Sequence, residues 1–187
     1  MIGGLPESLT LGSCEYGIAT DYRDIMVIME AYNDPELTNE ERVIVMLRYL
    51  YDDFGSIPIE LRQEAANQAV WFLDCGQMED DKKPTKKLID WEQDQPILFP
   101  AINKVAGRET RSAKYMHWWT FMGYFMEIGG DGLFSQILAI RQKKAKGKKL
   151  EKWEQEFYRN NKALCDIRTR YSQEEQDEID YWNKMLG

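Results

Sequence analysis

The chain has 187 residues, a hydrophobic fraction of 43%, a charged fraction of 30% and a formal net charge of −8 at pH 7. This length suits one domain or two small ones, and the composition is typical of a folded protein rather than a disordered one. The acidic balance argues against a general nucleic-acid-binding protein, which needs a basic face to displace counterions from phosphates.

The sequence has neither a signal-peptide pattern nor an apolar run near the roughly 20 residues of a membrane-spanning helix. Its three cysteines, Cys14, Cys75 and Cys165, are far apart and fit neither a disulfide framework nor a paired C-x-x-C metal site. We therefore expect a soluble protein of a reducing cytoplasm that does not bind membranes.

The first fifty residues predict a short β-hairpin followed by helices. A period-two pattern places Leu9 and Leu11 on one strand and Cys14, Tyr16 and Ile18 on the next, with a turn at Gly12-Ser13 between them. From Asp21 the apolar period becomes helical and ends at Asn33-Asp34-Pro35. Thr38 and Glu41 form a capping box that opens a second helix, which is expected to bury Val43, Met46, Leu47 and Leu50.

A third helix is predicted after Pro58 and is expected to stop at Gly76. Residues 77–89 are polar and lack an apolar period, which predicts a linker. The expected organisation is therefore an N-terminal hairpin plus helical subdomain at 1–76, a polar linker at 77–89 and a C-terminal helical subdomain at 90–187. Within the latter, Pro96 and Pro100 predict a kink or a late start in the helix over 90–105.

The segment from Tyr115 to Ile128 is apolar on nearly all sides of a predicted helix, so it must be buried or docked. Glycines at 129, 130 and 132 end it, and the helix that begins at Leu133 is expected to pair with it as an antiparallel hairpin. Ser172 and Glu175 form a second capping box, which opens a last helix. The predicted fold class is mainly α, a helical bundle with a short N-terminal β-hairpin.

The residues offer no catalytic apparatus. His117 is the only histidine and lies beside two tryptophans, where a core hydrogen bond is a better interpretation than proton transfer. The cysteines and His117 lack the close ligand pairs of a zinc site, and the glycines at 129–132 lack the G-K-[ST] of a phosphate loop. We therefore predict no enzyme activity, no catalytic residue, no cofactor and no metal.

Two features instead suggest contacts with other proteins. Trp118 and Trp119 point about 100° apart on a helix; we choose the stripe of Trp118, Phe121 and Phe125 for the core, which leaves Trp119 for a groove or a partner. The basic run from Arg141 to Lys152 is opposed only by Glu151, and a solvated loop and a docking patch for an acidic partner both stay open. The candidate interaction residues are Trp118, Trp119, Phe121, Phe125, Arg141, Lys143, Lys144, Lys148, Lys149 and Trp153.

Several strings of the sequence resemble one known family. They are YMHWWTF from Tyr115, ILAIR from Ile137, KKAKGKKLEKWEQEFYRNNK from Lys143, YGIATDYRDI from Tyr16, IPIELRQEAANQAVWFLDCG from Ile57 and DWEQDQPILFPAINKVAG from Asp90. Over about residues 5–165 the chain is similar to the phage gene-product-fifteen family, found among tail genes of phages and prophages of Gram-positive bacteria.

The resemblance implies a function in phage tail assembly. Members of the family look like tail assembly chaperones that coat the tape measure protein while the tail tube polymerises, and they bring no catalytic residues. The expected partners are phage tail proteins, the tape measure protein first, and the expected location is the host bacterial cytoplasm. A structural minor tail or connector component, retained in the virion, is the alternative. Self-association stays open.

Overall fold

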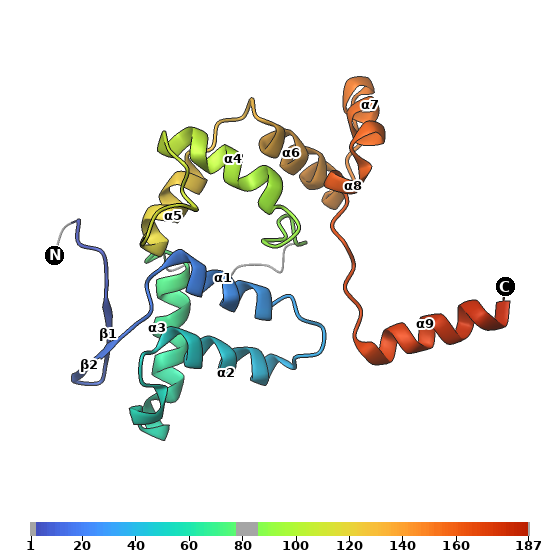
Figure 1. Cartoon of the computed structure of the whole chain (residues 1–187). Coiled ribbons are helices and arrows are strands. Elements are labelled where there is room, and N and C mark those ends of the chain that lie inside the picture. Colours follow the sequence, from blue (N-terminus) through green and yellow to red (C-terminus); the bar gives the residue numbers. More distant parts are fainter. Residues whose placement is uncertain (1–2, 78–85, 187) are drawn as a thin grey trace. The chain divides into compact units, whose positions relative to one another are not determined.

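The computed structural model describes residues 3–77 and 86–186, and these fall into two compact units (Figure 1). We call Pro6–Phe72 with the described residues from Thr169 onward the hairpin unit. The described residues of Met1–Leu5 and Leu73–Arg168 form the aromatic unit. Most of the predicted linker at 77–89 lies outside the described residues, so the three-part division of the chain stays a prediction.

The hairpin unit begins with the predicted β-hairpin. Strand β1 (Ser8–Leu11) pairs antiparallel with β2 (Cys14–Gly17), and Leu11 lies opposite Cys14 across the turn. Gly12 has a φ of +59° in that turn, a conformation that favours glycine. The Leu9 and Leu11 side chains are buried, so the period-two pattern identified the strand that packs into the core.

Helices α1 (Tyr22–Ala31) and α2 (Asn39–Leu50) pack against each other in the hairpin unit. The capping box of Thr38 and Glu41 is confirmed, with the Thr38 N–H donating to Glu41 at 2.8 Å. Val43, however, is 37% exposed, so its predicted burial is wrong. Tyr32, directly after α1, contacts the second half of α2, where its hydroxyl lies 3.4 Å from the Met46 sulfur. The first turn of α2 is exposed to solvent.

Two short 3-10 turns (Phe54–Ser56 and Ile59–Leu61) lead into α3 (Arg62–Leu73), whose buried residues include Ala65, Ala69 and Phe72. The same unit contains α9 (Gln173–Leu186). Its capping box is confirmed, since the Ser172 N–H donates to Glu175 at 2.8 Å and the Glu175 N–H to Ser172 at 3.2 Å.

The aromatic unit consists of α4 (Gln95–Ala106), α5 (Trp118–Met126), α6 (Leu133–Ala145), α7 (Lys152–Asn160) and α8 (Lys162–Cys165). Pro96 occupies the first turn of α4, which tolerates its missing N–H, so the predicted late start of this helix is confirmed. Helices α5 and α6 each pack against α4, and α8 packs against α6 and α7.

The predicted antiparallel pair of α5 and α6 is wrong. The buried apolar face of α4, which includes Leu98, Phe99 and Ile102, attracts both helices, so they cover α4 rather than each other. Phe125 contacts Phe134 across the glycine-rich connection between the two helices. The predicted mainly α fold with a short N-terminal hairpin is nevertheless confirmed. Within the described residues, no helix is both long and apolar enough to cross a membrane.

Candidate interaction surface

His117 determines where the aromatic helix α5 begins. Its Nδ1 accepts a hydrogen bond from the Trp119 N–H at 3.0 Å, and the side chain is only 3% exposed. The imidazole is therefore the N-cap of α5, which satisfies one of the backbone donors that every helix start leaves without a partner. The helix consequently starts at Trp118 and not at the predicted Tyr115, and His117 has the core hydrogen-bonding role that we expected.

The stripe of Trp118 and Phe121 forms the aromatic core. Both side chains are buried and stack with ring centroids 5.9 Å apart, and the Trp118 Nε1–H donates to the Leu73 carbonyl at 3.0 Å. Phe125 is half-buried and contacts the Trp91 ring at 5.5 Å. Trp119, on the neighbouring stripe, is also half-buried. Trp118 and Phe121 are thus not accessible to a partner in this structure, whereas Trp119 and Phe125 keep part of their surface open.

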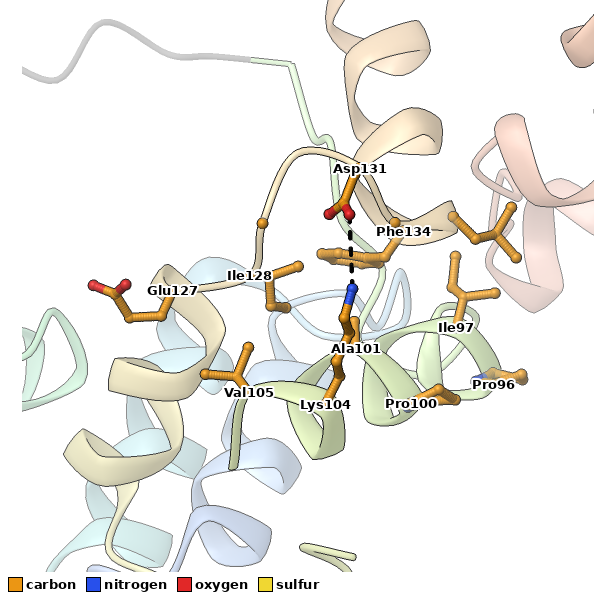
Figure 2. A pocket seen from close by; sticks show the side chains of 13 residues that line it. Pro96, Ile97, Pro100, Ala101, Lys104, Val105, Glu127, Ile128, Asp131 and Phe134 are labelled. Carbon is orange, nitrogen blue, oxygen red and sulfur yellow. Dashed lines mark ion pairs between the residues drawn. The ribbon is translucent and has the colours of Figure 1, made fainter. Parts of the chain in front are cut away.

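An apolar groove of about 590 Å³ lies between α4 and the connection from α5 to α6 (Figure 2). One wall is a row of α4 side chains, including Pro96, Pro100 and Val105, and the other runs from Ile128 to Phe134. Proline rings carry no backbone N–H, so the α4 wall presents hydrocarbon with few hydrogen-bond donors. Leu133, at the start of α6, is 46% exposed here and offers an apolar contact to whatever enters.

The groove also carries charge at its edge. Lys104 and Asp131 form an ion pair at 3.8 Å, and their side chains are 75% and 82% exposed (Figure 2). An ion pair this exposed contributes about 0–1 kcal/mol, so an incoming chain can separate it at little cost. The groove is therefore an open apolar surface whose rim can pair with charges of either sign.

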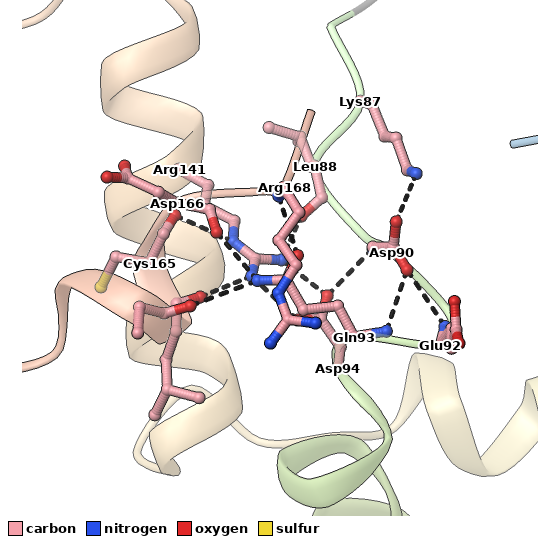
Figure 3. A network of polar contacts seen from close by, with 12 residues as sticks. Lys87, Leu88, Asp90, Glu92, Gln93, Asp94, Arg141, Cys165, Asp166 and Arg168 are labelled. Carbon is pink, nitrogen blue, oxygen red and sulfur yellow. Dashed lines mark hydrogen bonds and ion pairs between the residues drawn. The ribbon is translucent and has the colours of Figure 1, made fainter. Parts of the chain in front are cut away.

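Arg141 lies at the centre of a buried polar network (Figure 3). Two of its donors form a bidentate pair with Asp94 at 2.6 and 2.8 Å, and the two side chains are 3% and 1% exposed. The other three donate to the carbonyls of Leu88, Leu164 and Cys165. A guanidinium has five N–H donors, so every one of them has an acceptor. Arg141 therefore fastens three segments of the aromatic unit together and is not available for docking.

Lys143 and Lys144 are also engaged inside the chain. Lys143 donates to both carboxylate oxygens of Glu154 at 2.7 and 2.8 Å, and these bonds hold the pKa of Glu154 below its ordinary value. Lys144 pairs with Asp166 and Tyr158. Burial raises the pKa of Asp166, but the hydrogen bonds from Lys144 and Tyr158 outweigh it, so the pKa lies below its ordinary value.

The rest of the basic run forms an exposed cluster at the turn from α6 to α7. We call the residues from Lys146 to Trp153 the lysine tip. Lys146, Lys148, Lys149 and Lys152 are all exposed, and no carboxylate within the described ranges forms an ion pair with any of them. Trp153 is 58% exposed beside them. The tip thus combines unpaired positive charge with a large uncovered aromatic side chain.

Sequence reasoning missed the groove and the Arg141 network for different reasons. The two prolines of α4 signalled a helix irregularity, but their role as a groove wall depends on a connection about 30 residues away. Asp94 gave no signal because its partner lies 47 residues along the chain. Within the described parts of the chain, no three His, Cys, Asp or Glu side chains lie together as metal ligands would.

The structure defines a mainly α protein of two compact units with an apolar groove. The family model described as Bacteriophage Gp15 protein matches residues 1–167, which is most of the chain. The chain therefore belongs to this family and is a phage protein, and the resemblance noted in the sequence is confirmed. Comparison with curated proteins and with solved structures gives no match. Helix α9 lies outside the matched residues.

Proposed function

We propose that this protein is a phage tail assembly protein that acts as a tail assembly chaperone by binding the tape measure protein. It acts in the host bacterial cytoplasm and carries out no catalysis of its own. The observation that carries the proposal is the apolar groove on α4, in a chain that belongs to a phage protein family. A long, helical, apolar client needs such grooves, because it exposes more hydrocarbon than it can bury alone.

The apolar lining of the groove supports an apolar helix as its occupant. Its volume of about 590 Å³ falls within the ~300–1,000 Å³ typical of small-ligand pockets, so side chains that project from a helix can enter it. An amphipathic helix binds such a groove through residues spaced at i, i+3, i+4 and i+7. The exposed side chain of Leu133 would contact these anchors, while Lys104 and Asp131 at the rim would pair with flanking charges.

Co-expression with the tape measure protein of the same phage tests the proposal. We expect the wild-type chain to keep the client in the soluble fraction, and Leu133→Glu to lose this effect because the substitution places a charge inside the groove. Val70→Glu is the matched control: Val70 is 47% exposed against 46% for Leu133, but it lies on α3 in the other unit. Equal client solubility with the wild type and Leu133→Glu would contradict the role of the groove.

Mass spectrometry of purified virions separates a chaperone from a structural component. A chaperone leaves before the tail is complete, so we expect the protein to be absent or far below the copy number of the tail proteins. A stoichiometric amount in the virion would instead identify a minor tail or connector component.

A further inference from the structure

Helix α9 presents an uncovered amphipathic surface. Three large apolar side chains, Tyr181, Trp182 and Met185, are 58%, 52% and 65% exposed. The helix carries five carboxylates and one lysine, which gives a net charge of −4 from −5 and +1. The acidic residues are Glu174, Glu175, Asp177, Glu178 and Asp180.

These carboxylates have only local partners. Gln173 donates to Asp177 at 2.7 Å and Gln176 donates to Asp180 at 2.9 Å. None of the five forms an ion pair within residues 3–77 and 86–186. The aromatic side chains contact each other, with Tyr181 and Trp182 ring centroids 5.7 Å apart, and remain open to solvent. The exposed surface of α9 is therefore acidic and aromatic. Its complement would be a basic surface that also offers an aromatic side chain.

The lysine tip has the complementary composition. It offers four exposed lysines that form no ion pair with any residue the structure describes, and Trp153 is 58% exposed next to Lys152. Lysine stems can lie along aromatic rings while their ammonium groups reach carboxylates. Tryptophan is a frequent anchor of protein interfaces, and a methionine sulfur contacts aromatic rings favourably. Trp153 of the tip and the Trp182 and Met185 pair of α9 would supply the apolar centre, with the charges around it.

We propose that α9 of one copy of this chain binds the lysine tip of a second copy. The two surfaces differ, so the interface is heterologous, and each copy can bind one neighbour through α9 and another through its tip. The result is a head-to-tail series of copies. Such a series would bind a long client protein along its whole length. This role rests on the proposed function, whereas the self-association does not.

The test uses charge reversal in the full chain, followed by sedimentation velocity in buffer of low ionic strength. Lys148→Glu with Lys149→Glu alters the tip, and Glu174→Lys with Glu178→Lys alters α9. We expect the wild type to form larger species as its concentration rises, and each double variant alone to associate at least tenfold more weakly. The tip variant gives its tip the negative sign of α9, and the α9 variant leaves α9 with no net charge to attract the tip. An equimolar mixture of the two should form dimers again, since the unaltered tip of the α9 variant then meets the unaltered α9 of the tip variant.

Controls separate this interface from general charge effects and from misfolding. Arg108→Glu with Lys114→Glu makes the same change in net charge as the tip variant, at exposed positions outside the tip, and should associate like the wild type. Trp182→Ala should weaken association with an unchanged far-ultraviolet circular dichroism spectrum. A monomeric wild type, a mixture that stays monomeric, or equal weakening by the control variant would overturn the proposal. If association fails while co-expression still keeps the tape measure protein soluble, only this inference falls.

Discussion

Replacing Arg141 with methionine should be among the most destabilising single substitutions in the aromatic unit. The change keeps a long side chain but removes five donors at once, and each has an acceptor in the structure. Asp94, only 1% exposed, would lose its cation, although it would still accept from the Asp90 N–H at 3.0 Å. Three backbone carbonyls would lose a donor at the same time.

The size of the effect follows from this geometry. Removing one partner of a buried ion pair costs about 3–5 kcal/mol, because the other charge stays buried without compensation. The three carbonyls that lose their donor add less than the sum of their separate costs, because free-energy effects within one hydrogen-bond network are not additive. A loss of about 4 kcal/mol would be a large part of the ~5–15 kcal/mol that stabilises a folded domain. Arg141→Lys should recover little, because an ammonium has three donors and cannot form the planar bidentate pair.

Urea unfolding followed by tryptophan fluorescence and circular dichroism measures this loss. Gln142→Met is the matched control, because the neighbouring side chain is exposed and should change the free energy of unfolding by less than about 0.5 kcal/mol. Replacing both partners, as in Arg141→Met with Asp94→Leu, should recover part of the stability since no charge is then left buried. A single Arg141→Met variant as stable as the control would refute the reasoning.

Three further predictions concern the aromatic helix and the pairs behind the lysine tip. Trp118→Ala should lower the free energy of unfolding by about 3–5 kcal/mol, and Trp119→Ala by clearly less, in the same urea assay. His117→Ala should cost about 1 kcal/mol in thermal or urea unfolding, whereas His117→Asn, which can also cap a helix, should cost less. The pKa values of Glu154 and Asp166 lie below the ordinary 4.5 and 3.8, so their contribution is complete above these values and is lost as pH falls further. Unfolding at a series of pH values should therefore show a smaller acid-induced loss for Glu154→Gln than for the wild type.

The parts of the fold that the sequence predicted correctly are those decided by neighbouring residues. The Thr38 and Glu41 box, the Ser172 and Glu175 box and the turn at Gly12 all depend on partners within four positions of each other. Such local signals are visible in a single chain. The burial of Trp118 followed from the period of its own helix in the same way.

The parts that sequence reasoning missed depend on partners far along the chain. Arg141 looked like one more cation of a basic run, and only its contact with Asp94, 47 residues earlier, shows that it is a buried anchor. The pairing of α5 with α6 failed for a related reason, because a connection by glycines allows an antiparallel pair but does not require one. Both helices instead pack against α4, whose buried side chains include Leu98, Phe99 and Ile102.

The basic run divides into two parts that have different physical roles. As far as Lys144 its cations lie on α6, where neighbouring segments supply Asp94, Glu154 and Asp166 as partners. The helix ends at Ala145, and Gly147, with a φ of +65°, takes the left-handed conformation that commonly follows a helix end. Among the described residues, no carboxylate pairs with Lys146, Lys148, Lys149 or Lys152, so only the lysine tip has the free charge that a docking patch needs, and both interpretations of the basic run stay open for it. Its unpaired charge costs the fold little in water, and a bound acidic helix would gain from the full set of lysines at once.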